Sequence, residues 1–143
     1  MPGRPADAKS LGKTINTDYS ELDNDILLVA PFPGTKDDGP SARENLSFQT
    51  DWAVKAGRRC GVVVMISSLT SQDGDARRIY AEGMSPDLFF GAALVVGNPL
   101  ARAIASFFMG LSRPRIDTKL FDTIDGATAW LRSIRPGPKA SAP

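Results

Sequence analysis

The sequence predicts an α/β domain built on a mixed, mostly parallel sheet with flanking helices. Its strongest strand signals are short, continuous runs of apolar and β-branched residues, which are typical of strands buried on both faces. Segments with helical periodicity and capping residues separate these runs. Because parallel strands are joined by crossovers through helices, the expected order is ββαβαβαβα. The strands are expected at residues 14–19, 26–30, 61–66, 91–96 and 119–121.

The first two strands are predicted to pair antiparallel. Residues 14–19 alternate weakly between polar and apolar types, which favours an edge strand. Residues 26–30 form a continuous apolar run, which favours a buried strand. The polar cluster around Asp23 and Asn24 supplies the short turn that joins them.

The first helix is predicted over about residues 42–56. Ser41, followed three residues later by a glutamate, forms a capping-box pattern at its start. Gly57 is expected to end it as a left-handed cap. Two polar residues, Asn45 and Gln49, fall inside the arc of the helix that is otherwise apolar, so its buried face is only partly apolar.

The middle of the chain holds the clearest strand, at residues 61–66, which we expect in mid-sheet. Residues 67–74 are polar and are expected to form a loop. Asp73 is the predicted N-cap of a second helix, whose apolar stripe repeats every three or four residues as far as Gly83.

A third helix is expected after the strand at 91–96. Asn98 is its predicted N-cap, Pro99 occupies its first position, and Arg113-Pro114 ends it after about Leu111. Its apolar residues surround the axis, and a helix of this kind must be buried on more than one side. We therefore expect it to provide a surface for self-association or for an apolar ligand, through Ile104, Phe107, Phe108 and Leu111.

The domain is predicted to end with a short strand at 119–121 and a final helix that Asp125 caps and Pro136 stops. Residues 1–13 and 136–143 are rich in Pro, Gly, Ala and Ser and are expected to be disordered tails around a single domain at 14–135. No apolar stretch is long enough for a secretory signal or a membrane-spanning helix. A cytoplasmic protein is expected.

Composition excludes several classes of function. Seventeen basic residues against sixteen acidic residues give a net charge of +1, which argues against a nucleic-acid partner. The chain contains no histidine, the commonest general base and metal ligand, so we expect no catalytic residues, no metal site and no cofactor. The single cysteine, Cys60, is expected to be structural, and Asp37 and Asp38 are expected to be solvated surface residues.

Several segments of the C-terminal half carry a family resemblance. These segments are the run from Gly91 to Leu100, Phe107-Phe108, Arg113-Pro114, and Phe121 with Trp130-Leu131. They resemble the STAS domains, the SpoIIAA-like family of anti-sigma factor antagonists, in particular an uncharacterised bacterial branch. The resemblance covers about residues 14–135 and implies a SpoIIAA-like fold. Its motifs are structural, and none of them specifies a reaction.

The resemblance also implies a partner-binding segment at Ser71, Asp73, Gly74 and Asp75. Family members that switch partners carry an aspartate and a phosphorylated serine at the start of the second helix. Asp73 aligns with that aspartate, whereas Gly74 and Asp75 occupy the positions where hydroxyl residues are expected. Phosphorylation is therefore not expected here, and the charge of Asp75 near the helix N-terminus can either imitate a phosphate or simply cap the helix.

Two functions follow as hypotheses. The first is a non-enzymatic STAS-like module that binds a protein partner or itself as a homodimer. The alternative is a carrier or sensor of a small apolar, lipid-like molecule, because the third helix offers apolar surface and related α/β domains hold lipids. Fold-level analogy supports both, and such analogy is a weak warrant for function.

Overall fold

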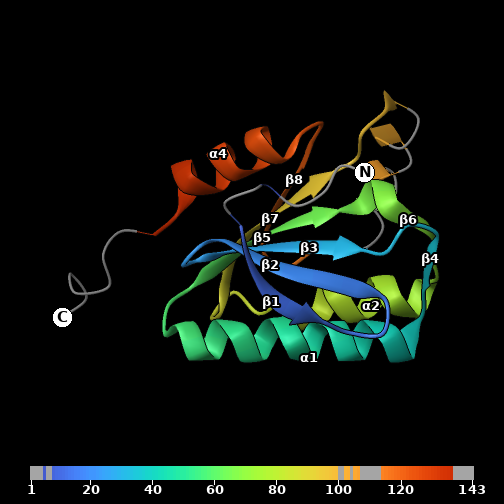
Figure 1. The fold of residues 1–143 in the computed structure, drawn as a ribbon, viewed down its shortest axis with the longest axis horizontal. Coiled ribbons are helices and arrows are strands. Elements are labelled where there is room, and N and C mark those ends of the chain that lie inside the picture. Colours follow the sequence, from blue (N-terminus) through green and yellow to red (C-terminus); the bar gives the residue numbers. More distant parts are fainter. Residues whose placement is uncertain (1–4, 6–7, 100–101, 104, 107–113, 137–143) are drawn as a thin grey trace.

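The protein is described by a computed structural model that covers residues 5, 8–99, 102–103, 105–106 and 114–136. A six-stranded sheet with the order β1-β2-β3-β5-β7-β8 forms its centre (Figure 1). The first three strands pair antiparallel and the remaining pairs are parallel, which confirms the predicted α/β class. The strands are β1 (Lys9–Lys13), β2 (Thr17–Asp23), β3 (Ile26–Pro31), β5 (Cys60–Met65), β7 (Phe89–Val95) and β8 (Asp117–Phe121).

Helices cover both faces of this sheet. The helices α1 (Gly39–Ala56) and α2 (Gly74–Gly83) lie on one face, and α4 (Ile124–Ile134) lies on the other (Figure 1). Successive strand residues point to opposite faces, so neighbours such as Leu27 and Leu28 enter different core clusters. This double coverage explains why the strand sequences are continuously apolar.

Two glycines allow α4 to approach the sheet closely. A Cβ atom on Gly61 would lie 3.0 Å from Phe90 Cζ and 3.1 Å from Leu131 Cδ2. A Cβ atom on Gly91 would lie 3.1 Å from Ile134 Cδ1. The predicted apolar stripe of the final helix therefore packs directly on the backbone of β5 and β7.

The N-terminal segment departs from the prediction of a disordered tail. Lys9–Lys13 forms the edge strand β1, which pairs with β2, so disorder over residues 1–13 is wrong for these five residues. Backbone hydrogen bonds to β2 and the packing of Leu11 on the core compensate for a polar composition. The sheet therefore begins before residue 14, and the remainder of the tail, apart from Pro5 and Ala8, lies outside the described residues, as do residues 137–143.

Helix ends were predicted to within a few residues. Gly57 ends α1 in the left-handed region, with φ of 70°, and Asp73 caps α2 by accepting from Ala76 N at 2.9 Å. The N-cap of α1 is Asp38 rather than Ser41. Ser41 instead lies three residues after the N-cap and forms the capping box with Asp38. Thr123, not Asp125, caps α4 and accepts from Gly126 N at 3.0 Å.

A second, two-stranded sheet occupies segments that the sequence indicates as loops. The strands β4 (Thr35–Asp37) and β6 (Leu69–Gln72) pair in parallel beyond the ends of β3 and β5, and a 3-10 turn, η1 (Ile66–Ser68), leads into β6. This small sheet holds the connections into α1 and α2 together at one end of the molecule.

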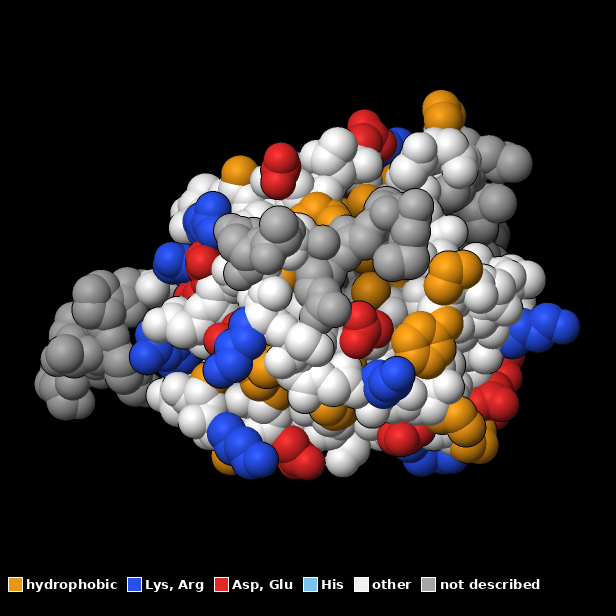
Figure 2. Space-filling view, in the orientation of Figure 1, with side chains coloured by type: hydrophobic (Ala, Val, Ile, Leu, Met, Phe, Trp, Pro, Cys, Tyr) orange, Lys and Arg blue, Asp and Glu red, His pale blue; other side chains and the backbone are white. Residues whose placement is uncertain are grey.

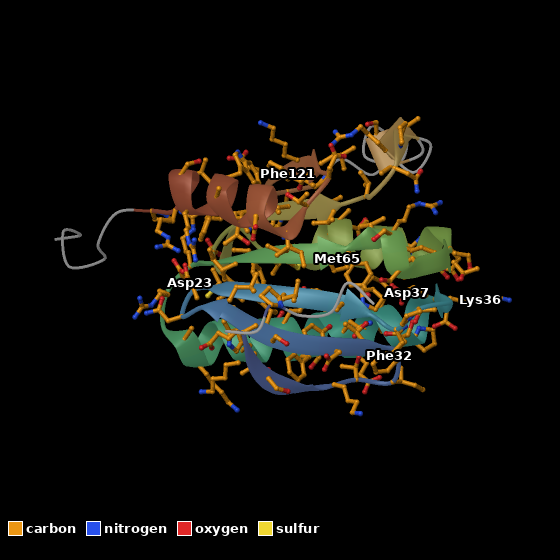
Figure 3. All side chains as sticks on the ribbon, turned by 45° about the horizontal axis from the view of Figure 1, so that its top comes forward. Asp23, Phe32, Lys36, Asp37, Met65 and Phe121 are labelled. Atoms are coloured by element: carbon orange, nitrogen blue, oxygen red, sulfur yellow. The ribbon has the colours of Figure 1, made fainter. Side chains whose placement is uncertain are left out.

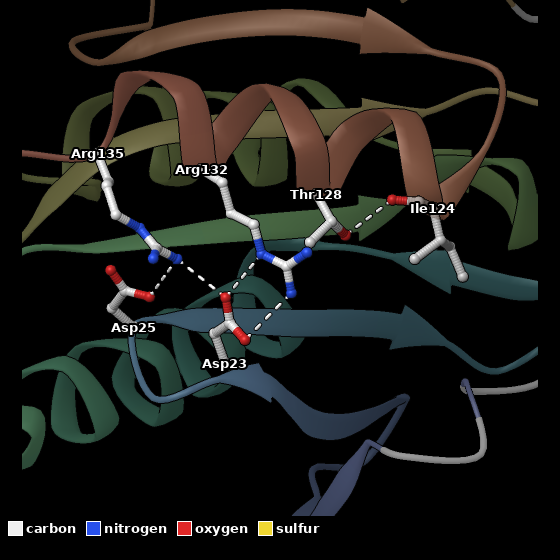
Figure 4. Close-up of polar contacts among 6 residues, drawn as sticks. All are labelled: Asp23, Asp25, Ile124, Thr128, Arg132 and Arg135. Carbon is white, nitrogen blue, oxygen red and sulfur yellow. Dashed lines mark hydrogen bonds and ion pairs between the residues drawn. The ribbon is translucent and has the colours of Figure 1, made fainter.

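An ion-pair cluster ties the opposite end together. Asp23 lies 2.9 Å from both Arg132 and Arg135, and Arg135 also lies 2.9 Å from Asp25 (Figure 4). These pairs connect the β2–β3 turn to the end of α4. On the face shown in Figure 2, basic and acidic side chains are interspersed. None of the helices in the described part of the chain has the length and apolar character needed to cross a membrane.

Candidate functional site

The site is centred on Asp37, at the end of β4. The side chain is 5% exposed, so the expectation of a solvated surface residue is wrong. Neighbouring Lys36 points outward, whereas Asp37 lies against the body of the molecule (Figure 3). The backbone also fixes the position, because Asp37 O accepts from Asp73 N at 3.0 Å.

Four uncharged donors surround the Asp37 carboxylate. Tyr80 Oη donates to Oδ2 at 2.9 Å, and Gln72 Nε2 donates to the same oxygen at 3.3 Å. Asn16 Nδ2 and Ser41 Oγ donate to Oδ1. The donors come from the β1–β2 connection, α1, β6 and α2, so the carboxylate links four parts of the chain. Hydrogen bonds of this kind can hold a buried carboxylate in one orientation.

The two polar residues in the apolar arc of α1 extend this network. Asn45 Oδ1 accepts from Tyr19 Oη at 2.8 Å, and Asn45 Nδ2 donates to Tyr80 Oη at 3.2 Å. Gln49 Nε2 donates to Tyr19 Oη at 3.2 Å. Asn45 and Gln49 are 1% and 3% exposed. Their partners explain why a helix that faces the core carries two amides.

Both tyrosines stay neutral in this setting. Burial raises the pKa of Tyr19 far above its ordinary value, and burial followed by the Asp37 charge does the same for the pKa of Tyr80. Tyr80 therefore remains a hydrogen-bond donor to Asp37 at neutral pH. Every buried side-chain nitrogen and oxygen atom in the described residues has a partner, so the network is complete.

A cavity of about 530 Å³ opens beside the Asp37 network. It lies over the carboxyl ends of β3, β5 and β7, on the face that α1 and α2 cover, where open α/β sheets commonly bind ligands. The floor is apolar, and one group of polar lining residues belongs to β4, β6 and α2. Further polar lining residues are Thr17, Gln49, Asn98 and Thr118. The lining includes Val29, Val62, Val64, Ala92 and Leu94 from the sheet, Tyr80 and Ala81 from α2, Met84 just after α2, and Asp37, Ser71, Gln72 and Arg77 at the polar end.

The predicted partner-binding residues lie beside the mouth of this cavity. Ser71 belongs to β6 and lines the cavity, whereas Asp73, Gly74 and Asp75 form the start of α2. All four are exposed. Asp75 pairs with Arg78 at 3.0 Å, a contact within one turn of the same helix. The structure thus brings the four residues together on one surface.

The predicted apolar surface cannot be placed in the same way, because Ile104, Phe107, Phe108 and Leu111 lie outside the described residues. The helix start is in place: Pro99 is helical and Arg102 N donates to Asn98 O at 3.0 Å. Ala105 is buried and lines the cavity. Self-association through this segment stays a prediction.

Cys60 is fully buried at the start of β5. Burial, followed by the charge of Asp25, raises the pKa of its thiol to about 12, so a reactive thiolate is not favoured at neutral pH. Sγ lies 3.3 Å from Arg58 O. In the ranges that the structure describes, no cluster of acidic or cysteine side chains has the geometry to hold a metal ion.

Comparisons with known proteins identify a family and a similar fold. The family model for a domain of unknown function, DUF7793, matches residues 20–135. The comparison with curated proteins found no match. Among solved structures, the chain is similar to the anti-sigma factor antagonist SpoIIAA in its unphosphorylated form, with a TM-score of 0.57 and 10% identity over 82% of this chain and 99% of that chain. At this identity the likeness establishes a SpoIIAA-like fold, which confirms the predicted architecture.

Proposed function

The chain belongs to the DUF7793 family, a domain of unknown function, and we propose that it acts as a non-enzymatic regulatory module that binds a protein partner. The observation that carries this proposal is the SpoIIAA-like fold, which spans 99% of the SpoIIAA chain. That protein is described as an anti-sigma factor antagonist. Fold-level likeness supports the class of function and leaves the partner open.

The proposed partner surface is the start of α2, defined by Ser71, Asp73, Gly74 and Asp75. Its backbone is held in place, because Asp73 N donates to Asp37 O and the Asp73 side chain caps α2. A surface that is already ordered loses less conformational entropy on binding. The buried network around Asp37 would therefore support the partner surface from beneath.

We do not expect phosphorylation to control this surface. Gly74 carries no hydroxyl, and Asp75 already places a negative charge in the first turn of α2. A carboxylate at this position interacts favourably with the helix N-terminus, as a phosphate would. Phosphopeptide mapping from the native host should find no stoichiometric phosphate on Ser67, Ser68, Thr70 or Ser71; stoichiometric phosphate on any of them would contradict this expectation.

A non-enzymatic role is supported by the residue chemistry. The chain has no histidine, and the single cysteine is buried with a raised pKa. A nucleophile needs a nearby base or a lowered pKa to react at neutral pH. A screen for hydrolase and transferase activity should detect no turnover, and turnover abolished by Asp73→Asn or Asp75→Asn would contradict this part of the proposal.

Affinity capture with matched variants tests the partner surface. The tagged full chain serves as bait in an extract of the native host, and captured proteins are quantified by mass spectrometry. We expect a captured protein whose amount falls at least tenfold with the Asp75→Lys bait and is unchanged with the Asp51→Lys bait. Asp51 is exposed in the C-terminal half of α1, so Asp51→Lys makes the same charge reversal outside the proposed partner surface. If no captured protein distinguishes the two variants, the proposed surface is wrong.

A further inference from the structure

We infer that the cavity beside Asp37 binds a neutral, mainly apolar small molecule that carries one hydrogen-bonding group at one end. This site is distinct from the partner surface, although Ser71 borders both. A volume of about 530 Å³ lies within the range of roughly 300–1,000 Å³ that small-molecule sites occupy. The sequence suggests an apolar ligand on the third helix, whereas this inference rests on the cavity lined by the sheet, β6 and α2.

Among the described residues, the two faces of the sheet are covered unequally beside the cavity. On the α4 face, Val63 and Ala93 are 0% exposed. On the opposite face, Val64 and Leu94 stay half-buried although they lie side by side in the register of β5 and β7. The ten-residue helix α2 packs beside α1, where a Cβ atom on Gly83 would clash with Leu46. Among the described residues, α1 and α2 therefore leave part of the apolar cavity floor uncovered.

The floor is suited to an apolar ligand. Val29, Val64 and Leu94 form one row across three neighbouring strands, and Val62 and Ala92 form part of the next row. Each apolar group of a ligand that leaves water for such a surface would favour binding. A cavity lined by groups of this kind holds water poorly, because water needs two to four polar partners.

The charges at the polar end favour a neutral ligand. Asp37 and Arg77 are the charged side chains among the described lining residues, and their charges are opposite. The Asp37 oxygens already accept four hydrogen bonds, and Arg77 Nη1 donates to Gln72 O at 2.7 Å. With one charge of each sign, this end offers a ligand ion no net counter-charge, and burying an ion without one is costly.

The polar end can still recognise one hydrogen-bonding group. Gln72 uses one N–H of its side-chain amide for Asp37, and an amide offers a second N–H and a carbonyl oxygen. Ser71, the preceding residue in β6, also lines the cavity. A donor or acceptor at one end of the ligand would fix its orientation here while the remainder covers the apolar floor.

A pair of fluorescent probes tests the site on the full chain. N-phenyl-1-naphthylamine is a neutral, apolar molecule with one N–H group, and 8-anilinonaphthalene-1-sulfonate has the same skeleton with an added sulfonate. We expect saturable binding of the neutral probe at one site per chain and binding of the sulfonate at least tenfold weaker. Equal or tighter binding of the sulfonate would overturn the preference for a neutral ligand.

Matched variants locate the binding. Val64→Phe adds volume to the cavity floor, whereas Val54→Phe makes the same change at a position on α1 that is 60% exposed. We expect Val64→Phe to weaken binding of the neutral probe at least tenfold and Val54→Phe to leave it unchanged. Leu94→Phe enlarges a side chain on the neighbouring strand and should weaken binding of the neutral probe to the same extent. It replaces Val64→Phe in the test if that variant does not fold.

Two outcomes would overturn the inference. One is wild-type protein that shows no saturable binding of the neutral probe, which would mean that the protein's own side chains or a second copy already fill the space. The other is equal weakening by the cavity and surface variants. Partner capture by Val64→Phe, measured separately, distinguishes failure of this site from failure of the proposed partner surface.

Discussion

Two carboxylates at opposite ends of the molecule are held in different ways. Asp23 and Asp37 lie far apart in Figure 3. Asp23 is 29% exposed and pairs with the guanidinium groups of Arg132 and Arg135. Asp37 is 5% exposed, accepts hydrogen bonds from four uncharged side chains and lines a cavity. The first arrangement joins two surface elements, and the second arrangement orders the wall of a candidate binding site.

The difference separates a structural cluster from a candidate functional site. Ion pairs at the surface compete with water and salt, so their net contribution to stability is small. A buried carboxylate must keep every donor in place, because a lost partner leaves other polar groups unsatisfied. The Asp37 end should therefore be sensitive to substitution, and the Asp23 end should be tolerant.

The largest effect is expected from Asp37→Ala. This change removes an acceptor of Tyr80, Gln72, Asn16 and Ser41, and these donors are buried or half-buried. We expect the free energy of unfolding to fall by roughly 2–3 kcal/mol, as measured by urea denaturation. A loss equal to that of Asp23→Ala, the matched control, would contradict the distinction between the two ends.

A smaller effect is expected from Gly61→Ala, which tests the packing of α4. The added methyl group would lie 3.0 Å from Phe90 and 3.1 Å from Leu131, so these side chains must shift. Overpacking of this kind costs roughly 1–3 kcal/mol, and we expect a value near the lower limit, measured by urea denaturation. In Gly74→Ala the nearest atom is 3.7 Å away, so this control should be neutral or slightly stabilising.

The smallest effect is expected from Asp23→Ala, at about 0.5–1 kcal/mol near neutral pH. Hydrogen bonding from Arg132 chiefly holds the pKa of Asp23 below its ordinary value of 3.8. A lowered folded-state pKa gives stability that is present above the unfolded-state value and is lost as the pH falls through the folded-state value. In urea denaturation at stepped pH, the difference between wild type and variant should therefore shrink as the pH falls below 3.8 and disappear below the folded-state pKa of Asp23. A difference that grows with acidity would contradict the ion-pair assignment.

Much of the fold could be predicted because it rests on local signals. A continuous β-branched run specifies β5, and a continuous apolar run specifies β7. Gly57 and Asp73 mark helix ends by their backbone and capping chemistry. The strand β1 was missed because its stability comes from pairing with β2, and Lys9–Lys13 has little apolar character of its own. The strands β4 and β6 were missed for the same reason, since each is short and polar.

The candidate site was harder to predict because its residues come together only in the folded chain. Asp37 stands between Lys36 and Asp38, both exposed, and the charged run resembles a surface loop. The usable signal was elsewhere, in Asn45 and Gln49 within the apolar arc of α1. Two amides on a core-facing surface require buried partners, and those partners are Tyr19 and Tyr80.

The central claim is that a neutral, apolar ligand binds at the Asp37 end of the molecule rather than at the Asp23 end. Nuclear magnetic resonance of the ¹⁵N-labelled full chain, titrated with N-phenyl-1-naphthylamine, tests it most directly. We predict the largest amide shifts at Val64, Gln72, Ala81 and Leu94, with little change at Asp23. Largest shifts around Asp23 and α4, or shifts scattered over both ends, would contradict the claim.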